Sequence, residues 1–269
     1  MASNIINFPN SHNSYPVDNF DGLSVKQIND LIADDYSSGI INLTANNEYV
    51  NQLPIIKMIR HLLRHVLMHG EVKLTKVGNL PPSLAKDLYA QGFILDDAIE
   101  HGITTLSKET DCNAIVLMRS LCELSGLVKN RSNTLSLTKK SLSLIESGEL
   151  FPLIFKSMCT KFSWAFFDGY ENEQIGQAGC SYSLYLLAKY GNVECETTFY
   201  SEKYFAAFPD ILTEQSPSGS SDSSHHCYEI RTFVRFLEYF GFISFTGNRF
   251  NHPKIKKTPL FTECVSINL

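Results

Sequence analysis

The sequence has no apolar run long enough to cross a membrane and no visible pattern of a secretion signal. A membrane-spanning helix needs about 20 mainly apolar residues, and no stretch of that length is free of charge here. Residues 1–19 have neither the basic nor the apolar stretch of a secretion signal and are rich in Asn, Ser and Pro. We therefore expect a cytoplasmic protein with no membrane partner, and a flexible N-terminus over residues 1–20.

Paired cysteines are also missing. Zinc ribbons and disulfide frameworks use cysteines at short, regular spacings such as C-x-x-C. The seven cysteines of this chain are an odd total at wide spacings: Cys112, Cys122, Cys159, Cys180, Cys195, Cys227 and Cys264. We expect reduced thiols and no structural metal.

Positive charge is in the minority. The chain has 23 Lys and Arg against 28 Asp and Glu, which gives a formal net charge of −5. The overall charge therefore does not indicate a polyanion binder, and any nucleic-acid surface must be local. The apolar share of 43% is typical of a folded globular protein.

The pattern of apolar residues, glycines and prolines predicts an α+β, helix-dominated fold with winged-helix-like units and short β-hairpins. After the flexible N-terminus we expect a winged-helix-like helical domain at 21–147 and an aromatic-rich helical segment at 148–213. A flexible loop at 214–224, where the sequence EQSPSGSSDSS has the composition of a linker, then leads to a C-terminal winged-helix-like unit at 225–269.

Two segments of the chain show a helix followed by a hairpin. Asp111–Leu124 has apolar residues at helical spacing and an N-terminal cap, and the residues after it turn at Ser132-Asn133. Near the C-terminus, a helix over Glu229–Phe240 precedes a hairpin with a turn at Gly247-Asn248. The order repeats although the residues do not, which indicates an internal architectural repeat.

The first of these segments resembles a known family. Leu121–Arg131 (LCELSGLVKNR) and Leu135–Lys140 (LSLTKK) are similar to the recognition helix and wing of winged-helix proteins of the MarR type. In that family a helix ends in Gly-Leu-Val and the wing closes in Leu-Thr-x-x-Gly, whereas Ser141 stands here in place of the glycine. The resemblance implies a winged-helix fold.

Other phrases look like those of a group of uncharacterised bacterial proteins. They are LTKVGNLP at Leu74–Pro81, RFxxYFG from Arg235 and KTPLF from Lys257. This resemblance implies a bacterial or phage origin and no known activity.

Three histidines lie four residues apart on the helix that is expected after Pro54 and that ends at Gly70. Neighbours among His61, His65 and His69 share one helix face at a spacing suited to a metal ion. The outer two are about 12 Å apart along the axis at 1.5 Å per residue, so the geometry allows a pair and not a triad. The alternative is a solvated helix face.

Two further clusters have chemistry suited to a metal or a nucleophile. His225, His226 and Cys227 follow the predicted loop and suit a zinc site or a Cys-His nucleophile, or form a plain loop-to-helix junction. Asp168 stands with two more carboxylates in one loop, where they suit a divalent cation or a nuclease centre, or are simply solvated. The two are Glu171 and Glu173.

Recognisable catalytic motifs are absent from the sequence. It contains no Gly-rich phosphate loop and no G-x-S-x-G elbow. We therefore predict a protein that is not an enzyme, with no catalytic residue, no cofactor and no bound metal. A metal-dependent hydrolase is the second alternative, which requires His225, Cys227 or Asp168 to converge in a cleft.

The strongest local charge signal is at the C-terminus. Two acidic residues, Glu229 and Glu238, stand among six basic ones that we predict to bind nucleic acid: Arg231, Arg235, Arg249, Lys254, Lys256 and Lys257. The two helical arginines share a face, and the other four accompany the hairpin, which suits a recognition helix beside a phosphate-gripping wing.

The leading functional interpretation is a non-catalytic, nucleic-acid-associated regulatory or accessory protein that uses its C-terminal unit. The alternative is a protein–protein interaction module that does not bind nucleic acid. A continuous basic stripe along Arg231, Arg235 and the wing favours nucleic acid, whereas an acidic surface elsewhere favours a protein partner.

Overall fold

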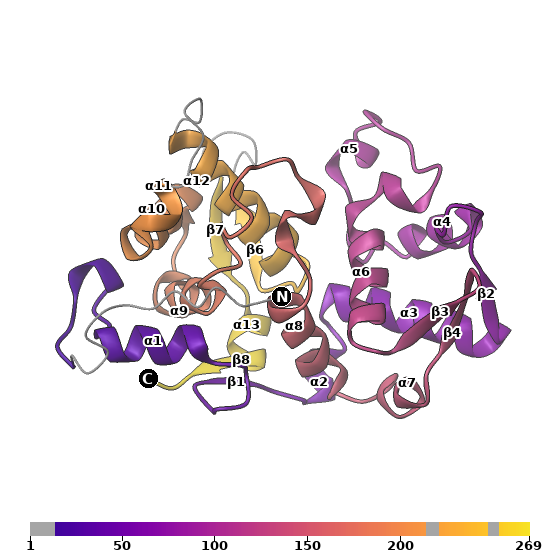
Figure 1. The fold of residues 1–269 in the computed structure, drawn as a ribbon, viewed down its shortest axis with the longest axis horizontal. Helices are drawn as coiled ribbons and strands as arrows, with labels where there is room; N and C mark the ends of the chain where they lie inside the picture. The colour runs from indigo at the N-terminus through magenta and orange to yellow at the C-terminus, as the bar shows by residue number, and fades with distance from the viewer. Residues whose placement is uncertain (1–13, 214–220, 247–252) are drawn as a thin grey trace. The chain divides into compact units, whose positions relative to one another are not determined.

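The computed structural model describes residues 14–213, 221–246 and 253–269. The fold is α+β and dominated by helices, as predicted, and these residues form three small antiparallel sheets (Figure 1). The predicted flexibility of residues 1–13 and of most of the 214–224 loop lies outside the described residues. Two compact units form, one from Thr44–Phe162 and one from Met1–Leu43 together with Ser163–Leu269. We call them the 44–162 unit and the split unit.

The 44–162 unit contains seven helices longer than one 3₁₀ turn and three strands within a continuous stretch of described chain. They are α2 (Asn47–Val50), α3 (Pro54–His69), β2 (Glu71–Lys73), α4 (Pro82–Ala90), α5 (Asp97–Glu100), α6 (Asn113–Leu124), β3 (Val128–Arg131), β4 (Thr134–Leu137), α7 (Lys139–Leu144) and α8 (Leu150–Thr160). A 3₁₀ turn, η2 (Glu109–Asp111), precedes α6.

The split unit begins with η1 (Asp18–Phe20), α1 (Val25–Ala33) and β1 (Ile41–Leu43) and resumes at η3 (Trp164–Phe167). Its later elements are α9 (Cys180–Tyr190), β5 (Cys195–Glu196), α10 (Thr197–Ala207), α11 (Pro209–Thr213), α12 (Ser221–Glu229), the π-helix η4 (Ile230–Leu237), β6 (Ile243–Thr246), β7 (Lys254–Lys257), α13 (Pro259–Cys264) and β8 (Val265–Ile267).

Local sequence signals explain where the main helices of the 44–162 unit begin and end. Pro54 occupies the first turn of α3, where its missing N–H costs nothing, and Gly70 ends the helix with φ +84°. The helix expected over Asp111–Leu124 starts at Asn113 instead, because the Asp111 carboxylate accepts hydrogen bonds from Ser107 N and Lys108 N and closes the preceding turn.

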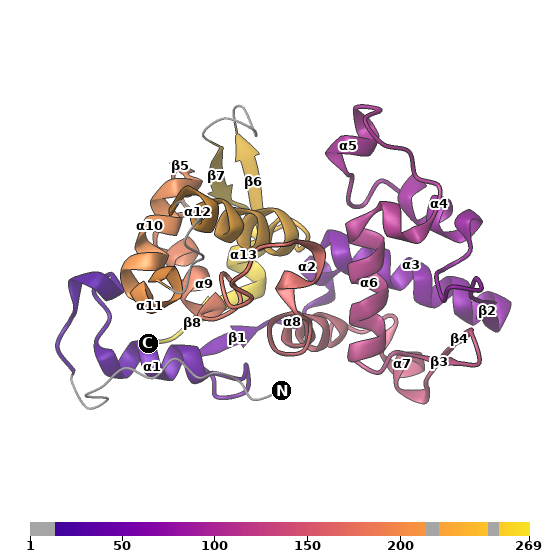
Figure 2. The same ribbon diagram turned by 45° about the horizontal axis from the view of Figure 1, so that its top comes forward.

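Each unit contains one three-stranded sheet built in the same way. In the 44–162 unit the strand order is β2-β4-β3, and in the split unit it is β5-β7-β6, so the third strand in sequence is central in both. The predicted turn at Ser132-Asn133 joins β3 to β4, and both residues have positive φ, as in the hairpin turns that match the sheet twist. Figure 2 shows β6 and β7 as the corresponding neighbouring arrows.

The order of elements also repeats. In the 44–162 unit the order is α3, β2, α4, α6 and the β3–β4 hairpin, with the short α5 and η2 between α4 and α6. In the split unit it is α9, β5, α10, α12 with η4 and the β6–β7 hairpin, with the short α11 between α10 and α12. The predicted internal architectural repeat is therefore present, and it is longer than the helix and hairpin from which it was predicted.

The unit boundaries differ from the expected ones at 147, 213 and 224. Residues 41–43 pair with 265–267 as strands β1 and β8, so the N-terminal segment belongs with the C-terminal one. Helix α8 packs against α6, which places residues 150–160 in the 44–162 unit. The predicted loop also ends earlier than expected, because α12 starts at Ser221.

Candidate nucleic-acid interface

Arg231, the first predicted nucleic-acid contact, is buried in the split unit. Its side chain has no solvent exposure. Nε and Nη2 donate to the two carboxylate oxygens of Asp168 at 3.1 and 2.7 Å, and Nη1 donates to the carbonyls of Asn172 and Ile175. No phosphate can reach the buried guanidinium, which argues against the predicted nucleic-acid contact at Arg231.

Arg235 shares the same carboxylate. Its Nη1 donates to Asp168 Oδ2 at 2.9 Å. Burial lowers the pKa of Arg231, but the hydrogen bonds to Asp168 and the nearby negative charges, that of Asp168 included, together outweigh it and raise that pKa above its ordinary value. Asp168 is thus committed to two arginines, which leaves it unsuited to the cation or nuclease site considered with Glu171 and Glu173.

The hairpin of the split unit presents two of its predicted basic residues to solvent. Lys254 and Lys256 are exposed on the central strand β7, on the face opposite to the buried Ile255. Lys257 faces the other way, donates from Nζ to the carbonyl of Ala188 at 2.9 Å, and has its pKa lowered by burial. Arg249 lies outside the described residues.

The equivalent helix of the 44–162 unit, α6, also has its arginine paired. Arg119 Nε lies 3.0 Å from a carboxylate oxygen of the buried Glu109, and Nη1 donates to the carbonyl of Gly78 at 2.6 Å. Glu123 adds a second carboxylate at 3.6 Å. Neither helix therefore offers a free arginine for base edges, and the continuous basic stripe expected along the C-terminal unit is interrupted.

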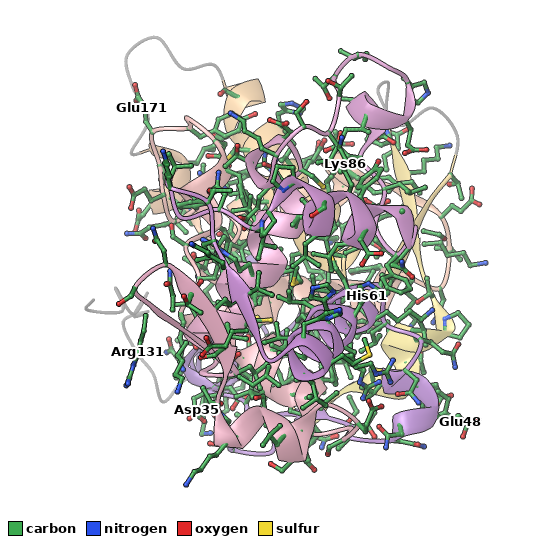
Figure 3. All side chains as sticks on the ribbon, turned by 90° about the vertical axis from the view of Figure 1, so that its right-hand side faces the viewer. Asp35, Glu48, His61, Lys86, Arg131 and Glu171 are labelled. Carbon is green, nitrogen blue, oxygen red and sulfur yellow. The ribbon has the colours of Figure 1, made fainter. Side chains whose placement is uncertain are left out.

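A group of cations on the sheet of the 44–162 unit has no local signal in the sequence. Lys73 on β2 and Lys129 and Arg131 on β3 are exposed, and among the described residues none of the three forms an ion pair with a carboxylate. Figure 3 shows the Arg131 side chain extending away from the ribbon. The signal was hidden because Lys73 is far in sequence from β3, and only the pairing of both strands with β4 brings them onto one sheet.

The two units also differ in charge. Residues 44–162 hold 14 Lys and Arg against 11 Asp and Glu, a net charge of +3. The rest of the chain holds 9 against 17, a net charge of −8. The 44–162 unit as a whole is therefore net positive and the rest of the chain net negative, so the first attracts a polyanion more than the second.

The candidate metal and nucleophile residues are occupied in other ways. His61 Nε2 lies 2.6 Å from Asp87 Oδ2, while the rings of His65 and His69 stack at 4.3 Å. His225 Nδ1 is 2.7 Å from the hydroxyl of Ser201, and burial raises the pKa of Cys227 to about 12, which keeps its thiol protonated at neutral pH. Over the described residues, no group of three or more His, Cys, Asp or Glu side chains is placed to hold a metal ion.

None of the helices within the described residues is both long enough and apolar enough to span a bilayer. Comparison with family models, with curated proteins and with solved structures gives no match to this chain. Topology, charge and burial are therefore the grounds for inferring its function.

Proposed function

We propose that this protein is a non-catalytic, nucleic-acid-associated regulatory or accessory protein with two winged-helix-like units. The observation that carries the proposal is the repeated order of helix, strand, two helices and hairpin, with the last strand in the centre of each sheet. In a winged helix, the third helix of this series is the recognition helix and the hairpin is the wing.

The mode of contact in this proposal differs from that of a helix inserted in the major groove. Recognition helices read bases with arginine, lysine and amide side chains at their exposed face. Here Arg119 and Arg231 are paired with Glu109 and Asp168, so the wings carry the contact and the helices support them. Contacts of this kind position a protein on the phosphate backbone and carry little sequence information.

A cytoplasmic location belongs to the same proposal. The seven cysteines all lie within the described residues, form no disulfide there, and six of them are buried, which suits a reducing compartment.

The alternative, a protein-interaction module, is favoured by one observation. Large apolar side chains are exposed at several places on the 44–162 unit, and protein-interaction sites are rich in such residues. They are Leu67, Met68, Val77, Leu95, Ile103, Leu124 and Leu142.

Fluorescence anisotropy with the full chain tests the nucleic-acid proposal directly. Labelled 20-base-pair DNA and RNA duplexes and their single strands are titrated at about 50 mM salt, where phosphate contacts are strong. Saturable binding that weakens as salt rises is the expected result. If no nucleic acid binds at that salt concentration, the proposal fails and the protein-interaction function takes its place.

A further inference from the structure

The outward face of the β2-β4-β3 sheet in the 44–162 unit has an ordered arrangement of charged and hydroxyl side chains. In the cross-strand register, Lys73, Thr134 and Arg131 form one row. Glu71, Ser136 and Lys129 form the next row. Side chains directly opposite one another on antiparallel strands share a face, so both rows point away from the buried Val72 and Leu135.

We infer that this face is a binding site for the sugar–phosphate backbone of a nucleic-acid duplex. The inference rests on the proposed function and locates its contact. Lys73, Lys129 and Arg131 bind phosphate oxygens as cations, and Thr134 and Ser136 between them donate hydroxyl hydrogen bonds. Lysine, arginine, serine and threonine are the side chains with which proteins contact phosphates.

The spacing of the cations suits a row of separate phosphates. Neighbouring strands lie about 4.8 Å apart, so the edge strands β2 and β3 hold their cations about 10 Å apart across β4. The central strand has only hydroxyls on this face, which keeps Lys73 and Arg131 from lying directly opposite each other, where like charges destabilise a sheet. Exposed cations without carboxylate partners are available to release counterions on binding.

The same face favours a duplex over a single strand. Proteins that bind single strands stack the bases on aromatic side chains along a basic groove. The six outward positions all lie within the described strands 71–73, 128–131 and 134–137, and none of them is aromatic. A face that holds phosphates but stacks no bases recognises the regular backbone of a duplex, in DNA or in RNA.

Glu71 adds a negative charge to this face, so its removal is expected to affect duplex binding in the opposite direction to removal of the cations. It is exposed on the same face, in the row of Lys129, and no ion pair joins its carboxylate to another described residue. A carboxylate there repels phosphates. Glu71→Gln keeps the shape of the side chain and is expected to tighten duplex binding.

The decisive experiment compares two triple variants of the full chain by anisotropy over a range of salt concentrations. Lys73→Ala/Lys129→Ala/Arg131→Ala removes the cations of the sheet. Lys57→Ala/Lys86→Ala/Lys108→Ala removes three exposed lysines of the same unit that lie on α3, on α4 and before η2. Figure 3 shows Lys86 and Arg131 on separate parts of the unit. Both variants lower the net charge equally, so any difference between them reports position.

The sheet variant is expected to bind duplex at least about tenfold more weakly at 50 mM salt and to lose up to about 3 from the slope of log affinity against log salt. The control variant is expected to keep the wild-type slope, since contacts and not distant charges set it. Wild type is expected to bind duplex DNA or duplex RNA more tightly than the matching single strands, and the tighter duplex identifies the source of the backbone.

Circular dichroism confirms that each variant is folded before its binding is interpreted. Equal slopes of log affinity against log salt for the sheet variant and wild type overturn the inference. Tighter binding of single strands than of duplexes by wild type also overturns it. In both cases the proposed function stands. Absence of binding by wild type itself is the separate failure of the proposed function. An unchanged or weaker affinity of Glu71→Gln also counts against the site.

Discussion

The two units of this protein have the same order of elements but different interiors. In the split unit the largest fully buried side chains include four tyrosines, namely Tyr182, Tyr200, Tyr204 and Tyr228, together with five phenylalanines. In the 44–162 unit the corresponding helices α3 and α6 bury mainly Ile, Leu, Val and Met. The two units therefore have the same order of elements with different apolar residues buried in the corresponding helices, as expected where the pattern of burial matters more than residue identity.

The arginine of the third helix differs between the units in a similar way. Arg231 is completely buried and its partner Asp168 is almost so. The Arg119 side chain keeps 19% exposure and has a second carboxylate nearby in Glu123. Removing the partner therefore has different consequences, because only Arg119 can turn towards water.

The largest expected effect comes from Asp168→Ala in the split unit. It leaves the buried charge of Arg231 without a carboxylate, which typically costs about 3 to 5 kcal/mol of unfolding free energy. Glu109→Ala in the 44–162 unit is expected to cost only about 1 to 3 kcal/mol, through the lost acceptor of Leu80 N and the weakened Arg119 pair. Urea unfolding of both variants measures the difference.

The single tryptophan, Trp164, separates the two units in that experiment. It is buried in the split unit, where its ring centroid lies 4.7 Å from that of Phe236. Tryptophan fluorescence reports the unfolding of the split unit, whereas far-ultraviolet circular dichroism reports the unfolding of both units. Glu171→Ala, an exposed carboxylate of the same loop as Asp168, is the control and should change stability by less than about 0.5 kcal/mol. If Asp168→Ala is no more harmful than Glu109→Ala, burial does not distinguish the two pairs.

A smaller difference is expected between two glycines with the same backbone conformation. Gly179 in the split unit and Gly126 in the 44–162 unit both have φ +72°, which strains any other residue. A Cβ on Gly179 would lie 2.6 Å from the Phe208 ring, whereas one on Gly126 meets no atom within 4 Å. Gly179→Ala should cost about 2 to 4 kcal/mol and Gly126→Ala about 1 kcal/mol in thermal or urea unfolding. Equal costs would show that the split unit relaxes around the ring.

The smallest expected effect is a difference in pH dependence. Burial raises the pKa of Glu109 in the 44–162 unit, and the hydrogen bond from Leu80 N and the charge of Arg119 do not fully offset it. The folded unit therefore binds a proton more tightly than the unfolded chain, so stability is gained as pH falls through the raised pKa and is fully present below 4.5. Glu109→Gln should remove this gain.

Asp21 in the split unit has the opposite sign. Burial raises its pKa, but hydrogen bonds from Lys189, Lys203 and Tyr190 together outweigh it and lower the net pKa below 3.8. The contribution of Asp21 to the stability of the fold is fully present above pH 3.8 and is lost as pH falls through its lowered pKa. Hydrogen exchange of peptides from each unit, between about pH 3 and 7, resolves the two trends. If protection changes with pH in the same direction in both units, or if Glu109→Gln leaves the pH dependence of the 44–162 unit unchanged, the opposite signs assigned to Glu109 and Asp21 are contradicted.

Local patterns in the sequence determined much of the fold. The helix after Pro54, the hairpin turn at Ser132-Asn133 and the helix-dominated α+β class all follow from helical spacing, Gly and Pro signals and strand alternation. Each of these signals spans fewer than about 20 residues, so it survives without knowledge of the rest of the chain. The repeated helix and hairpin was visible for the same reason.

The tertiary structure alone decided which charged residues are exposed to solvent and which are paired. Asp168 and Arg231 are 63 residues apart in sequence, and nothing local indicates that they pair. The strands β1 and β8 come from the two ends of the described chain, and Lys73 joins Lys129 and Arg131 only through β4. Long-range pairing depends on the packing of the whole unit and not on neighbouring residues. The sequence by itself therefore determined the kinds and order of the elements, while tertiary packing decided which cations face solvent.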